Sequence, residues 1–182
     1  MKKLSILLFF ALLAFSSKTT AQGKFGKDSV ECVRSLSFYT DYMKQGNLNE
    51  AAPLWRDAVK YCPPGLRQTI YVDGQKIYRF LIEKNAGNAQ LKEKLIDSLL
   101  MMYDIRTQYF PRYAQSAQTN KVIDIINFKG SDDNLVFNAI MDNINTFGSS
   151  AEPSLMVFAM QRANTLFANK AIGAEKVLDL YS

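Results

Sequence analysis

Apolar residues recur every three to four positions along most of the chain, and sustained two-residue alternation is scarce. That period is typical of amphipathic α-helices rather than of β-strands. Gly and Pro cluster between the periodic stretches, where they interrupt helices. The pattern predicts seven or eight helices, over about residues 29–45, 49–61, 66–84, 88–109, 114–128, 132–147 and 153–169, and from about 173 to the chain end.

The second of these helices carries its own start signals. Asn49 is the expected N-cap and Glu50 the first helical residue, where a negative charge suits the helix dipole. Pro53 then falls at the edge of the first turn, where a missing N–H costs least. Because the connections between helices are short, successive helices should run antiparallel. The sequence therefore predicts an all-α fold built from helix pairs.

One 34-residue window, from Cys32 to Gly65, holds a characteristic set of residues. Gly46 lies at the expected turn between two helices, and Ala51, Trp55, Ala58 and Pro63 follow it in one register. Small alanines allow two helices to approach closely, a large residue fills the gap to the next helix, and Pro stops the second helix. In these positions the window resembles the tetratricopeptide repeat (TPR), a helix–turn–helix unit.

The similarity continues into the next unit. Ile70, Gly74 and Ile77 match the first helix of a repeat, and the segment from Tyr71 to Tyr78, YVDGQKIY, is similar to one shared by exported TPR-like proteins of Gram-negative bacteria. The resemblance implies a right-handed α-solenoid of antiparallel helix pairs, with partly degenerate repeats. Its units are expected at about residues 32–65, 66–112, 114–148 and 151–182, the last one incomplete.

The N-terminus has the layout of a secretory signal. Lys2 and Lys3 precede an apolar run from Leu4 to Phe15, and small residues up to Ala21 offer a cleavage site. The run is shorter than the roughly 20 residues that a spanning helix needs, which disfavours the alternative of a retained anchor. We therefore expect residues 1–21 to be a signal peptide, residues 22–31 an N-terminal segment and residues 32–182 the helical domain.

Export changes the charge of the chain. Loss of three lysines with the signal lowers the formal net charge from +5 to +2. A nearly neutral surface without a basic run predicts no nucleic-acid partner. No second apolar run approaches spanning length, so no membrane span is expected after signal removal. The expected location is periplasmic or associated with the outer membrane.

The chain has two cysteines, Cys32 and Cys62. Cys32 lies near the start of the first predicted helix and Cys62 at the end of the second, and these ends are neighbours in an antiparallel hairpin. An exported chain permits a disulfide, which we predict here. Two free buried thiols are the alternative.

Composition argues against several kinds of catalysis. The chain contains no histidine, which excludes Ser-His-Asp, Cys-His and HExxH arrangements within it. Neither GxGxxG nor GxxxxGK[ST] is present, and two isolated cysteines cannot complete a zinc site alone. We therefore expect no enzyme activity, cofactor or metal. Asp97, Asp104 and Asp124 are expected on helix surfaces.

A helical repeat of this family offers a binding groove instead. The positions that line the groove in the family correspond here to two sets of residues. The first unit supplies Leu36, Thr40, Met43 and Lys44, and the second supplies Gln68, Tyr71, Gln75, Tyr78 and Arg79. Packing against a neighbouring helix is the alternative role for these side chains.

The expected function is that of a non-enzymatic protein–protein interaction scaffold of the cell envelope, with a protein partner. Two alternatives stay open: a glycan- or peptide-binding module of an uptake system, and the non-catalytic N-terminal part of a longer protein. The sequence predicts no oligomeric state.

Overall fold

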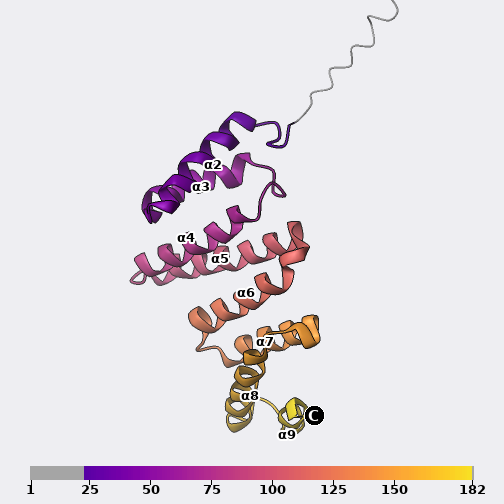
Figure 1. The fold of residues 1–182 in the computed structure, drawn as a ribbon. Helices are drawn as coiled ribbons and strands as arrows, with labels where there is room; N and C mark the ends of the chain where they lie inside the picture. Colours follow the sequence, from indigo (N-terminus) through magenta and orange to yellow (C-terminus); the bar gives the residue numbers. More distant parts are fainter. Residues whose placement is uncertain (1–22, 182) are drawn as a thin grey trace, which may run out of the picture.

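The computed structural model describes residues 23–181, and within this range the chain is all-helical, without strands. Figure 1 shows the helices stacked in one direction, from α2 and α3 at one end to α8 and α9 at the other. Each helix packs chiefly on its neighbours in sequence. The α-helices are α2 (Ser29–Lys44), α3 (Leu48–Tyr61), α4 (Thr69–Lys84), α5 (Ala89–Tyr109), α6 (Ala114–Lys129), α7 (Asp133–Phe147), α8 (Pro153–Ala168) and α9 (Ala174–Leu178).

These bounds confirm the predicted all-α fold and its helix pairs, and they correct two helix starts, because α4 begins at Thr69 rather than at about residue 66 and α3 begins at Leu48. Asn47, rather than Asn49, caps α3: its side-chain oxygen accepts from the backbone N–H of Glu50 at 3.3 Å. Pro53 therefore lies in the second turn, inside the helix. The predicted signal peptide, residues 1–21, lies outside the described residues.

In α3 a large buried residue, Trp55, lies between two small buried alanines. Ala51 and Ala58 of α3 are fully buried, and Trp55 between them is 1% exposed. The indole Nε1 donates to the carbonyl oxygen of Ile70 on α4 at 2.7 Å. Gly74, one turn further along α4, lies directly against the indole ring, where a side chain would not fit. Trp55 therefore joins the first helix pair to the second.

Cys32 on α2 and Cys62 at the end of α3 form the predicted disulfide, with their Cα atoms 4.8 Å apart. Both residues are buried in the core of the first pair. The bond closes a loop with a sequence separation of 30 residues. Such a loop closure stabilises a fold by roughly 3–4 kcal/mol, chiefly through the entropy of the unfolded chain.

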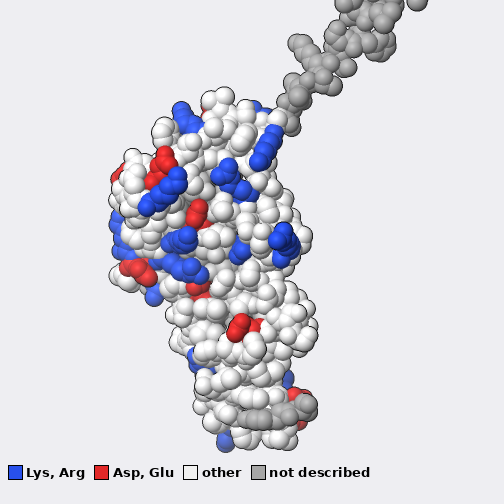
Figure 2. All heavy atoms as spheres, in the orientation of Figure 1, with Lys and Arg blue, Asp and Glu red and all other residues white. Residues whose placement is uncertain are grey.

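Three buried clusters follow one another along the stack. The first surrounds Trp55 in α2–α5, the second surrounds Tyr103 in α4–α6, and the third surrounds Ile140 in α6–α9. Charged side chains gather over α2–α5 on the face shown in Figure 2, whereas the surface over α6–α9 is largely uncharged there. On this face the two ends of the molecule therefore present different surfaces.

Candidate functional site

The first set of predicted groove residues meets at one end of α2. Thr40, Met43 and Lys44 line a shallow hollow of about 520 Å³ together with Asp73 and Lys76 of α4. Burial raises the pKa of Asp73 above its usual range, and the ammonium of Lys76, 3.5 Å from the carboxylate, opposes this shift. Leu36 is buried in the core below. The structure thus brings three of these residues together on an accessible surface.

The second set takes part mainly in contacts between helices. The side-chain oxygen of Gln68 accepts from Nη2 of Arg106 on α5 at 2.9 Å. Tyr71 is buried, and its hydroxyl donates to the carbonyl oxygen of Pro64 at 3.0 Å. Burial raises the pKa of Tyr71 to about 12. These two side chains hold α4 against its surroundings.

Gln75 and Tyr78 also face the interior. Gln75 is 4% exposed, and Tyr78 packs edge-on against Trp55 with ring centroids 5.4 Å apart. The structure therefore does not bring the second set onto the same open surface as Thr40 and Met43. The packing role that the sequence left open accounts for these positions.

Arg79 is the centre of a polar cluster that links three helices. Its Nε donates to the carboxylate of Asp124 on α6 at 3.0 Å, and its Nη2 donates to the hydroxyl of Tyr103 on α5 at 2.6 Å. The Tyr103 hydroxyl in turn donates to Asp124 at 2.5 Å. Burial, followed by this hydrogen bond, raises the pKa of Tyr103.

This cluster corrects the placement of Asp124. The sequence indicated a helix surface, but Asp124 is 2% exposed. A buried carboxylate needs a cation and further hydrogen bonds to offset its desolvation, and Arg79 and Tyr103 supply them. The ion pair of Arg79 and Asp124 thus joins the second helix pair, α4 and α5, to the third, α6 and α7. The Arg79 side chain is still 36% exposed.

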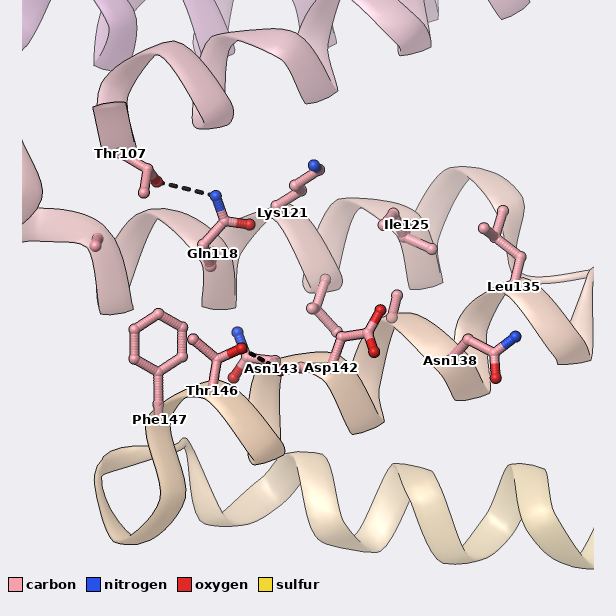
Figure 3. A pocket seen from close by; sticks show the side chains of 13 residues that line it. Thr107, Gln118, Lys121, Ile125, Leu135, Asn138, Asp142, Asn143, Thr146 and Phe147 are labelled. Carbon is pink, nitrogen blue, oxygen red and sulfur yellow. Dashed lines mark hydrogen bonds between the residues drawn. The ribbon is translucent and has the colours of Figure 1, made fainter. Parts of the chain in front are cut away.

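A second cavity lies elsewhere, between α5, α6 and α7. It has a volume of about 560 Å³. Its apolar part is formed by Val122 and Ile125 of α6 and by Leu135, Ala139 and Phe147 of α7. Figure 3 shows Ile125 of α6 and Leu135 and Phe147 of α7 around the space between the two helices. A cavity of this size and lining matches small-molecule and side-chain binding sites in general.

The rim of this cavity on α5 and α6 is polar and internally paired. The side-chain amide of Gln118 donates to the hydroxyl of Thr107 at 2.9 Å, as Figure 3 shows. The ammonium of Lys121 lies 2.7 Å from a carboxylate oxygen of Asp104. These contacts fix the rim side chains and leave Lys121 neutralised by Asp104.

The α7 side of the cavity is different. Asn138 and Asp142 are exposed and line the cavity, and within residues 23–181 neither side chain has a hydrogen-bond or ion-pair partner. Asn143 also lines it but is 4% exposed, and both its side-chain oxygen and its nitrogen lack partners in that part of the chain. Figure 3 places the amide of Asn143 in the space between α6 and α7.

Sequence reasoning missed this cavity because no single motif marks it. Its lining comes from three helices whose relative rotation the apolar period does not define. One signal was present: Asn143 interrupts the apolar face of α7 that Val136, Phe137 and Ile140 form. Amides at such positions need partners when they are buried.

Comparisons with protein-family models, with curated proteins and with solved structures find no match to this chain. Between residues 23 and 181, no helix combines the length and apolar character needed to cross a bilayer. The same residues contain no group of three or more His, Cys, Asp or Glu side chains arranged to hold a metal ion.

Proposed function

We propose that this chain is an exported, non-enzymatic scaffold of the cell envelope, in the periplasm or at the outer membrane, which binds a protein partner in the cavity between α5, α6 and α7. The single observation that carries the proposal is this cavity of about 560 Å³, in which unpaired polar groups of α7 stand beside an apolar lining. Such a combination is typical of surfaces that recognise other molecules.

The disulfide supports export. Disulfides form and persist outside the reducing cytosol, and Cys32 and Cys62 are joined in the core of the first helix pair. The basic and apolar start of the sequence points in the same direction.

A TPR-like, right-handed superhelix is the arrangement we propose for the helix pairs. The buried positions of Ala51, Trp55 and Ala58 support it, because these residues perform the packing roles that the repeat assigns to them. Stacked helix pairs present extended surfaces rather than closed catalytic pockets, which is why such folds serve as binding scaffolds.

The glycan-binding alternative has less support. Sugar recognition by stacking needs exposed aromatic faces, and the exposed rings of Phe38, Tyr109 and Phe167 do not line the cavity. The cavity itself has one aromatic lining residue, Phe147. A protein ligand uses the apolar lining and the unpaired amides more fully than a sugar does.

Filling the cavity tests the proposed function. The full chain, produced with residues 1–21 so that it is exported and the disulfide forms, is tagged and cross-linked in envelope preparations. Ala139→Phe places a ring in the cavity, and Ala168→Phe places the same ring at the exposed end of α8. We expect the first variant to lose a partner that the wild type and the second variant retain. Equal capture by all three proteins, or saturable binding of purified oligosaccharides instead, would refute this assignment.

A further inference from the structure

The cavity between α5, α6 and α7 contains an unsatisfied amide that folding alone does not explain. A buried side-chain amide without partners costs free energy, and native structures contain few of them. Among the described residues, Gln75 and Thr119 each leave one buried polar atom unpaired, but Asn143 leaves both its side-chain nitrogen and its side-chain oxygen unpaired. A group that offers one donor and one acceptor together would satisfy it. The main-chain peptide unit of another protein is such a group.

The exposed row beside Asn143 has the spacing of an extended peptide. Asn138, Asp142 and Thr146 follow one another at intervals of four residues along α7 and line the same cavity. Four residues of helix advance about 6 Å. Two residues of an extended chain advance about 6.7 Å. Over these two intervals an extended segment therefore stays nearly in register with the polar groups of α7.

The net charge of the C-terminal part of the chain, which contains α6 and α7, indicates what kind of side chain a bound peptide would carry. Residues 114–182 contain five Lys and Arg against seven Asp and Glu, so this part of the chain is net negative, whereas the rest of the mature chain is net positive. Lys121 is already paired with Asp104, but the exposed carboxylate of Asp142 has no partner among the described residues. A basic side chain is the complement of Asp142.

We propose that the cavity binds an extended segment of a partner protein along α7, through its main chain and a basic side chain. One peptide unit of the segment pairs with the amide of Asn143, whose oxygen and nitrogen are both buried in the structure and become accessible by rotation of the whole side chain. An apolar side chain enters the space between Val122, Ile125 and Phe147, and a neighbouring Lys or Arg reaches Asp142. This inference rests on the proposed function and names the ligand class of the same cavity.

A random dodecapeptide display library, panned on the full disulfide-bonded chain and depleted on the Ala139→Phe variant, provides the probe. We expect the selected peptides to share an apolar residue next to Lys or Arg. Asn143→Ala and Asn143→Leu should each weaken their binding about tenfold, as expected for the loss of two hydrogen bonds. Asn145→Leu, an exposed position on the same helix, is the matched control and should leave binding unchanged.

Two further measurements separate main-chain recognition from simple apolar contact. Methylation of successive main-chain nitrogens of a selected peptide should weaken binding strongly at one position and little at its neighbours. Asp142→Asn should weaken binding about two- to fivefold, the range of an exposed ion pair. Because Trp55 lies in the first buried cluster, far from α7 along the stack, far-UV circular dichroism and thermal melts are used to check that each variant is folded.

Failure of this inference is distinct from failure of the proposed function. If the library yields no peptides above the Ala139→Phe background, or if their binding is unaffected by both Asn143 variants, main-chain recognition in this cavity is refuted. If Ala139→Phe still abolishes capture of a partner in envelope preparations, the scaffold function stands and the cavity binds a different kind of surface. If neither experiment depends on Ala139, both proposals are wrong.

Discussion

Replacing Gly74 by alanine tests the contact that joins the first helix pair to the second. In an unobstructed helix this change would stabilise the protein by about 0.8–1 kcal/mol, because alanine is the better helix former. Here a Cβ on Gly74 would stand 2.9 Å from Cε2 of Trp55 and nearer still to Cζ2. The indole is 1% exposed and is held by its hydrogen bond to the Ile70 carbonyl. The added carbon must therefore displace either the ring or α4.

The magnitude follows from what the displacement breaks. Overpacking of a filled core costs about 1–3 kcal/mol. Loss of the hydrogen bond from Trp55 Nε1 to the Ile70 carbonyl leaves a buried donor unpaired, at a cost of about 1–3 kcal/mol. After subtraction of the helix-propensity gain of about 1 kcal/mol, we expect Gly74→Ala to lower the free energy of unfolding by roughly 1–5 kcal/mol. That is a large part of the stability of a single domain.

The assay uses the fact that Trp55 is the single tryptophan of the chain. Urea denaturation followed by its fluorescence gives the stability, and the emission maximum of the native protein reports whether the indole has become more exposed. Gly87→Ala is the control, because a Cβ there meets nothing within 4 Å and should change stability by less than about 0.5 kcal/mol. The reasoning is refuted if Gly74→Ala is as stable as the wild type and emits at the same wavelength.

Three more predictions concern stability. Replacing both cysteines by serine should lower the free energy of unfolding by roughly 3–4 kcal/mol in urea denaturation, and a change below about 1 kcal/mol would contradict the loop-closure argument. The folded-state pKa values of Tyr71, about 12, and of Tyr103 lie above the unfolded value near 10, so their neutral forms favour the folded state. Their contribution to the free energy of unfolding should be complete below pH 10 and lost as the pH rises further. Thermal melts and tyrosinate absorbance at 295 nm between pH 8 and 12 would detect this loss. Ionisation of all tyrosines near pH 10 with unchanged helicity would argue against it. Asp124→Asn should lower the free energy of unfolding by about 1–3 kcal/mol, as measured by thermal melts, which is less than for a fully buried pair because Arg79 is partly exposed. The control, Asp97→Asn on the exposed face of α5, should leave the stability almost unchanged.

The helix limits were predictable because breakers separate the helices. Pro111 follows the end of α5, and Gly130 follows the end of α6, close to the expected positions. The pairing of Cys32 with Cys62 was predictable for a related reason: the ends of an antiparallel hairpin are neighbours, and both residues lie at such ends. These features depend on local sequence and on connection length.

The orientation of α4 could not be derived in the same way. Gln68 and Arg79 are polar residues on an amphipathic helix, a pattern that favours an exposed face. Their partners, Arg106 and Asp124, lie 38 and 45 residues further along the chain, on other helices. A sequence pattern shows that a position is polar. It does not show whether the fold brings a polar partner from another helix next to it. The same limit explains why Asp124 was expected on the surface.

The buried polar groups in the middle of the stack and those of α7 differ in a way that bears on function. In α4–α6, Arg79, Asp124 and Tyr103 satisfy one another, so this cluster costs little and holds two helix pairs together. Asn143 of α7 lies in a similar setting without any such partner among the described residues. If Asn143 served only packing, leucine at this position would stabilise the fold, since it removes an unsatisfied polar group at similar volume. Proteins retain residues that reduce the free energy of unfolding chiefly at functional sites. An asparagine at position 143, where leucine would make the fold more stable, is therefore best explained by the binding of a ligand.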